Sequence, residues 1–83
     1  MQISKKLAVK FLDTFDEADA DGKLIKVIGG FSGMLQVRGF MEALKLADID
    51  GVETVEVNEA DFKKFFGALK TYKESKGEEF AAS

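Results

Sequence analysis

The chain has 83 residues, a net charge of −3 and 46% hydrophobic residues, eight of them Phe. This length forms one domain whose core is just sufficient for stable folding. The absence of Cys excludes disulfides and zinc–thiolate sites, and the absence of His removes the usual proton shuttle and the commonest transition-metal ligand. Lysines and acids are interleaved, so no basic surface for nucleic acid is indicated. We therefore expect a protein that is not an enzyme and binds no nucleic acid.

The first ten residues do not read as a secretory signal. Lys10 interrupts the segment that would have to be apolar, and no cleavage site of small residues follows. No apolar run in the chain approaches the roughly 18 residues of a membrane span. We expect a cytoplasmic protein without membrane contact. Small accessory proteins of bacteria or their phages commonly have this size and composition.

The N-terminal segment, residues 2–17, shows the clearest helical period in the first half of the chain. Ile3, Leu7, Phe11 and Phe15 recur every four positions, as on the buried face of an amphipathic helix. The acid-rich stretch that follows leads into Gly22, which is a typical helix stop.

Residues 23–28 are short, rich in β-branched side chains and bounded by Gly, which predicts a strand. The next five residues hold three Gly and predict a loop, because Gly destabilises a helix interior. A second helix is expected over residues 33–48. Its apolar stripe consists of Met34, Val37, Met41 and Leu44, widened by Phe40 and Ala47.

Residues 52–57 predict a second strand, with apolar and polar residues mixed as on a half-solvated surface. Asn58 is a strong N-cap residue for a third helix that runs to about Ser75. Gly77 ends this helix. We expect one globular domain over residues 1–77 and a flexible tail over residues 78–83.

The predicted fold is therefore α+β or small α/β, in the order helix, strand, helix, strand, helix. If the two strands are parallel neighbours, the middle helix makes a right-handed crossover. A two-stranded sheet leaves both strands as edges, and pairing with another copy or with a partner's strand would cover them. This is the physical basis for expecting a homo-oligomer.

Two acidic turns, residues 16–22 and 48–51, could hold a metal ion. The candidate ligands are Asp19 and Asp21 in the first turn, and Asp48, Asp50 and Glu59 in or after the second. The second segment resembles an EF-hand loop, with Asp48, Asp50 and Glu59 at the first, third and twelfth positions. The resemblance implies calcium as a cofactor and an all-α, divergent EF-hand pair as an alternative fold.

Both loops depart from the EF-hand pattern. Ile28 stands at the twelfth position of the first loop and cannot ligate calcium. In the second loop, Val52 replaces a ligand and Glu53 replaces the Gly of the sharp turn. The residues between the loops are also too few for two helices and a linker. Plain acidic turns without a cofactor are favoured, and calcium remains the alternative.

The glycine-rich loop could bind phosphate or a nucleotide through backbone N–H groups at the start of the next helix. The residues that would do so are Gly29, Gly30, Ser32 and Gly33. The Walker pattern is missing, because no Gly-Lys-Ser/Thr follows. An ordinary strand-to-helix turn is favoured, since such turns also require Gly.

The aromatic stripe of the third helix is the candidate interaction surface. It consists of Phe62, Phe65, Phe66, Leu69 and Tyr72. Helical spacing favours a core role, but adjacent Phe65 and Phe66 cannot both face the same way, which leaves one of them either exposed or buried at a dimer contact. The favoured function is that of a small, self-associating accessory protein that binds another protein or itself, through Phe-rich helix faces and strand edges. A calcium-binding module and a phosphate- or nucleotide-binding domain are the alternatives.

Overall fold

A computed structural model describes residues 1–80 and shows a small α+β fold, which confirms the predicted fold class. Two short strands pair antiparallel, and helices make up most of the rest. The elements are β1 (Gln2–Ser4), α1 (Lys5–Ala20), α2 (Leu24–Val27), α3 (Met34–Lys45), β2 (Thr54–Glu56) and α4 (Glu59–Ser75), with short 3-10 turns η1 (Phe31–Gly33) and η2 (Leu46–Asp48) flanking α3. The sheet means that the all-α alternative is not adopted.

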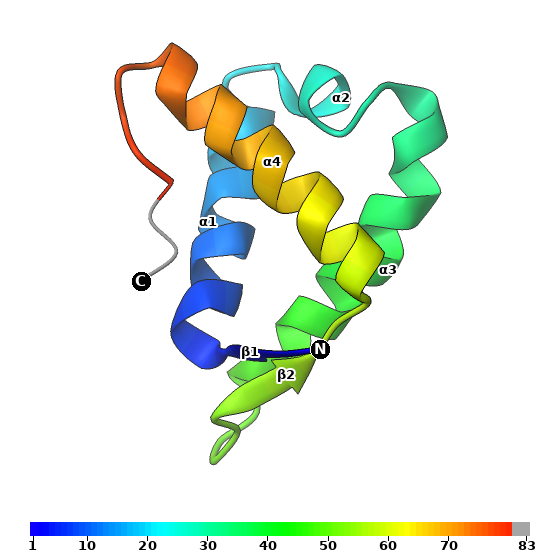
Figure 1. Cartoon of the computed structure of the whole chain (residues 1–83), viewed down its shortest axis with the longest axis vertical. Coiled ribbons are helices and arrows are strands. Elements are labelled where there is room, and N and C mark those ends of the chain that lie inside the picture. The colour runs from blue at the N-terminus through cyan, green and yellow to red at the C-terminus, as the bar shows by residue number, and fades with distance from the viewer. Residues whose placement is uncertain (81–83) are drawn as a thin grey trace.

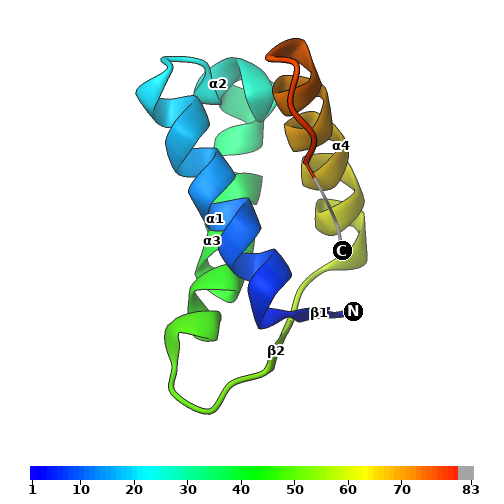
Figure 2. The ribbon, with the colours of Figure 1, turned by 90° about the vertical axis from the view of Figure 1, so that its left-hand side faces the viewer.

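Helices α1, α3 and α4 pack against one another around a single core (Figures 1 and 2). The short helix α2 lies at one end of this three-helix arrangement, and the sheet lies at the other end. Since α1 and α4 also contact α2, that end of the core is covered. None of the helices within residues 1–80 is long and apolar enough to cross a membrane.

The strand predicted over residues 23–28 is wrong, because the segment forms the four-residue helix α2. Its β-branched residues would have needed a neighbouring strand, but β2 pairs with the N-terminal residues instead. Gly29 and Gly30, with φ of 93° and 83°, then turn the chain, and the Gly30 N–H donates to the Ile25 carbonyl at 2.7 Å. The parallel crossover is therefore not formed either.

The first helix begins later than predicted, because Gln2–Ser4 forms strand β1. Its register with β2 places Gln2 opposite Glu56, Ile3 opposite Val55 and Ser4 opposite Thr54. Ile3 is buried from the strand, so the helical period that included it was misleading. Ser4 is the N-cap of α1, and its Oγ accepts a hydrogen bond from the Leu7 N–H at 3.1 Å.

The predicted second strand and the other two helices are confirmed with small changes of boundary. The strand is shortened to Thr54–Glu56, and the predicted helix over residues 33–48 is α3 with parts of its flanking 3-10 turns. Asn58 caps α4, because its Oδ1 accepts from the Asp61 N–H at 3.0 Å. The cap signal was thus sufficient to fix this helix start.

Phe11 lies at the centre of the core. Its ring is 5.2 Å from that of Phe40, 5.3 Å from that of Phe80 and 5.6 Å from that of Phe62, each in an edge-type arrangement. Phe80 lies beyond the predicted domain boundary at residue 77, yet it is buried. The rest of the predicted tail, residues 81–83, lies outside the described residues. The predicted boundary therefore stays a prediction, although the core reaches past it.

Candidate interaction surface

The predicted aromatic stripe of α4 builds the core rather than a free surface. Phe65, Leu69 and Tyr72 are buried, while Phe62 and Phe66 are half-buried and pack against the core. Neither of the adjacent Phe65 and Phe66 is exposed, because Phe66 turns toward Phe11 and Phe80. A partner has little access to these side chains in the folded domain.

The N–H groups of the three glycines in the glycine loop donate hydrogen bonds to backbone carbonyls within the protein. The Gly29 N–H donates to the Lys26 carbonyl at 3.2 Å, and the Gly33 N–H donates to the Gly30 carbonyl at 3.0 Å. The Ser32 hydroxyl donates to the Gly29 carbonyl at 3.3 Å. These donors, with that of Gly30 described above, are therefore already paired in the structure. Phosphate binding at this loop stays a prediction that the geometry does not favour.

The acidic residues of the two turns lie on separate parts of the surface. Asp19 and Asp21 are at the end of α1, Asp48 is in η2, Asp50 is in the next loop, and Glu59 begins α4. The Asp21 carboxylate accepts from the Tyr72 hydroxyl and from Lys76, and Glu59 is 3.5 Å from Lys63. Within residues 1–80, no three Asp, Glu, His or Cys side chains are grouped to hold a metal ion. Calcium binding stays a prediction.

A cluster of charges joins the C-terminal ends of α1 and α4. Glu17 accepts from Lys76 and, at 3.0 Å, from Lys73. These two lysines hold the pKa of the Glu17 carboxyl below its ordinary value, and Glu17 with Asp21 raises the pKa of Lys76. The Tyr72 hydroxyl, followed by Lys76, lowers the pKa of Asp21. Glu17 and Asp21 of the first acidic turn thus link the C-terminal ends of α1 and α4.

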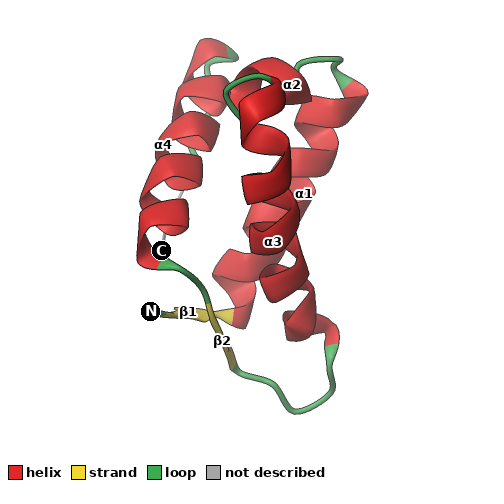
Figure 3. Ribbon diagram, turned by 90° about the vertical axis from the view of Figure 1, so that its right-hand side faces the viewer, coloured by secondary structure: helices red, strands yellow, loops and turns green. Residues whose placement is uncertain are grey.

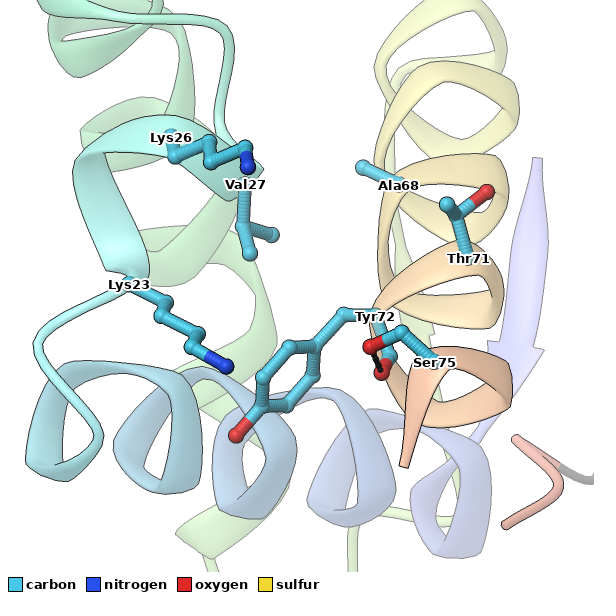
Figure 4. A pocket seen from close by; sticks show the side chains of 7 residues that line it. All are labelled: Lys23, Lys26, Val27, Ala68, Thr71, Tyr72 and Ser75. Carbon is cyan, nitrogen blue, oxygen red and sulfur yellow. Dashed lines mark hydrogen bonds between the residues drawn. The ribbon is translucent and has the colours of Figure 1, made fainter. Parts of the chain in front are cut away.

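A hollow of about 500 Å³ lies between α2 and α4 (Figure 4). Its lining consists of Lys23, Lys26, Val27, Ala68, Thr71, Tyr72 and Ser75. The Ser75 hydroxyl donates to the Tyr72 carbonyl at 2.6 Å, and the Tyr72 hydroxyl donates to Asp21. Two of the three hydroxyls are therefore committed to the protein, and the lining contains no His, Cys or carboxylate.

Large apolar side chains are exposed along α3 and its flanking turns. Phe31 is 80% exposed and Leu35 79%, while Leu46 and Ile49 are 52% and 55% exposed. Phe31 and Leu35 are one helical turn apart, and Leu35, Gly39 and Leu46 share one side of the helix. We call the following five residues the outer face of α3: Phe31, Leu35, Gly39, Leu46 and Ile49. Figure 3 looks onto α3, and none of the described elements covers most of its length.

The opposite side of α3 is held by the rest of the fold. Val37, Phe40 and Leu44 are buried in the core. The Gln36 side chain donates to the Asp61 carboxylate at 2.7 Å and accepts from the Lys64 ammonium at 2.6 Å, which ties α3 to α4. Because these contacts fix the rotation of the helix, the outer face cannot turn inward.

The outer face continues into a groove of about 510 Å³ between α2 and α3. The groove is lined by Leu24, Ile25, Ile28, Met34, Val37, Arg38, Met41, Glu42 and Lys45. Ile25 and Met34 are themselves exposed. Arg38 and Glu42 are exposed on the solvent side of α3, and neither forms an ion pair with another residue in the range 1–80. Lys45, also exposed, has no ion pair in this range either, so the apolar area is accompanied by two unpaired positive charges and one negative charge.

Sequence reasoning missed the outer face. The signal that could have found it is the set of large apolar residues left outside the predicted stripe, Phe31, Leu35 and Leu46. Comparison with protein-family models, curated proteins and solved structures found no match. The side chains themselves therefore carry the argument about function.

Proposed function

We propose that this chain is a small, non-enzymatic, cytoplasmic interaction domain that docks a protein on the outer face of α3. The observation that carries the proposal is the exposure of Phe31 and Leu35, two large apolar side chains one helical turn apart. Full burial of such a side chain is worth about 1.5–3 kcal/mol. A contiguous apolar patch with a polar rim is typical of a protein-binding site.

The use of Phe elsewhere in the chain supports the same proposal. All eight Phe lie within residues 1–80, and Phe31 alone among them is exposed. The other rings are buried or packed against the core, so the fold has a use for each of them. Phe31 contributes little to that core. Its place on the surface is therefore best explained by a contact with another molecule.

Site-specific cross-linking in cells that produce the chain tests this proposal. A photoreactive benzophenone side chain is introduced at Leu35, and in a matched control at Lys70, which is exposed on α4. We expect irradiation to give a discrete protein adduct from position 35 and none from position 70. If position 35 gives no more adduct than position 70, the outer face does not dock a protein and the proposal is wrong.

A further inference from the structure

We infer that the partner is a second copy of this chain, bound through the outer face of α3 in an antiparallel pair with two-fold symmetry. The axis lies level with residue 40, so that Arg38 of each copy meets Glu42 of the other. This inference rests on the proposed function and names the partner of the same surface. The charges and the apolar positions of α3 carry it.

Of the three unpaired charges, Arg38 and Glu42 complement each other only in one orientation. In an antiparallel pair, positions equidistant from the axis face each other, so Arg38 and Glu42 form two equivalent ion pairs. A parallel pair would place Arg38 against Arg38 and Glu42 against Glu42, which disfavours association. Within residues 1–80, neither side chain has another ion-pair partner from which it would have to be released. Arg38 and Glu42 are thus self-complementary in this orientation, and Lys45 lies opposite the uncharged Leu35.

The same axis also matches the exposed apolar residues. Phe31 and Ile49 lie at opposite ends of α3, in η1 and just after η2, each nine positions from residue 40 along the chain, so an antiparallel pair brings them toward each other across the interface. Leu35 comes within one position of Leu46 in the same way. Near the axis, Gly39 has no side chain, and the space where its Cβ would lie is empty. Two helix backbones can therefore approach closely at the centre of the pair.

The size of the surface predicts a weak pair. At 1.5 Å per residue, the twelve residues of α3 span about 18 Å, and the outer face extends only a few residues beyond each end of the helix. One helix face of this length buries less than the roughly 1,600 Å² of a standard interface. We therefore expect a rapid monomer–dimer equilibrium at micromolar concentration. The groove between α2 and α3 lies beside the contact, and Ile25 and Met34 can extend it.

Charge reversal combined with sedimentation equilibrium tests the register. Arg38→Glu and Glu42→Arg each place like charges in contact, and we expect each to weaken dimerisation at least about tenfold. The double variant exchanges the two charges and restores the wild-type affinity. A mixture of the two single variants forms a heterodimer, because every contact then joins Glu to Arg. Only the antiparallel register predicts that each single variant weakens the homodimer and that the double variant restores it.

A matched control separates the register from general effects of charge. Lys63→Glu makes a charge change of the same size on exposed α4, where Lys63 pairs with Glu59, and leaves dimerisation unchanged. Circular dichroism verifies that each variant is folded. A wild-type chain that stays monomeric at millimolar concentration overturns the inference, and so does a dimer that Arg38→Glu leaves intact.

The cross-link from position 35 distinguishes the two proposals. An adduct of two copies of this chain supports both of them. An adduct with a different protein, together with a monomeric chain in solution, keeps the proposed function and overturns the second-copy inference. If position 35 gives no adduct above the position 70 control, both proposals fall.

Discussion

Replacing Gly33 with Ala should destabilise the domain, although Ala is the better helix former. Gly33 is buried at the start of α3, with φ of −84° and ψ of −9°, which suits any residue. A Cβ added there would lie 2.0 Å from the Ile28 carbonyl oxygen and 2.9 Å from its carbon. Both are backbone atoms and cannot rotate away, so the end of α2 would have to move.

The size of the effect follows from this forced displacement. Overpacking a well-packed interior costs typically about 1–3 kcal/mol. For a domain of this size, each kcal/mol lowers the melting temperature by about 4–8 °C, so we expect a decrease of roughly 4–24 °C. The helix propensity of Ala recovers at most about 1 kcal/mol of this.

Gly67→Ala is the matched control, because it makes the same chemical change in the middle of α4. Position 67 is exposed, and nothing lies within 4 Å of the added Cβ. At this position only the higher helix propensity of Ala affects stability, and we expect a gain of about 0.5–1 kcal/mol in the free energy of unfolding. Both variants are compared with the wild type by thermal and urea denaturation followed by circular dichroism.

The opposite signs of the two effects make the reasoning testable. If Gly33→Ala is as stable as the wild type while Gly67→Ala gains stability, the close approach between Ile28 and η1 is not a constraint. Packing would then not require Gly at position 33.

Three further predictions concern the core, a cap and pH. Phe11→Ala should lower the free energy of unfolding by about 3–5 kcal/mol, whereas Phe31→Ala should change it by less than about 0.5 kcal/mol. Urea denaturation at a concentration where the chain is monomeric measures both. Asn58→Ala should cost about 1 kcal/mol through loss of the α4 cap; a variant as stable as the wild type in the same assay would contradict the observed hydrogen bond. The pKa of Glu17 lies below its ordinary value of 4.5 in the folded state, so the stability from its lysine partners is present above that pH and lost below it. The melting temperature should fall between about pH 5 and pH 3, and Glu17→Gln should make it less dependent on pH; an unchanged dependence would refute the role of the cluster.

Signals within a few residues were sufficient to predict much of α3, β2 and α4. Asn58 followed by Glu59 and Asp61 marks a helix start by capping and by favourable charge at the helix N-terminus, and both effects are local. The stripe that includes Val37 and Leu44 correctly identified the buried side of α3. These elements agree with the prediction because their local preferences and their tertiary contacts favour the same structure.

The errors arose where a distant segment decided the structure. Residues 23–28 have the composition of a strand, but no strand is available to pair with them, so they form α2. Ile3 fits a helical period equally well, and only β2, far along the chain, draws it into a strand. The outer face was missed for a related reason. The pattern shows that Leu35 lies off the buried stripe, but only the packed fold shows that no other element covers it.

The pairing of β1 with β2 has a consequence for folding during synthesis. Gln2 and Glu56 are 54 positions apart, so β1 must remain unpaired until β2 has left the ribosome. The contact between the rings of Phe11 and Phe80 can form only later still, after Phe80 has been synthesised. Helices α1 and α3 can form early from local contacts, but the segments that close the core are synthesised after them. The nascent chain therefore exposes Phe11, Phe15 and Phe40 until α4 and Phe80 have been synthesised, and this interval is when the domain is most vulnerable to aggregation.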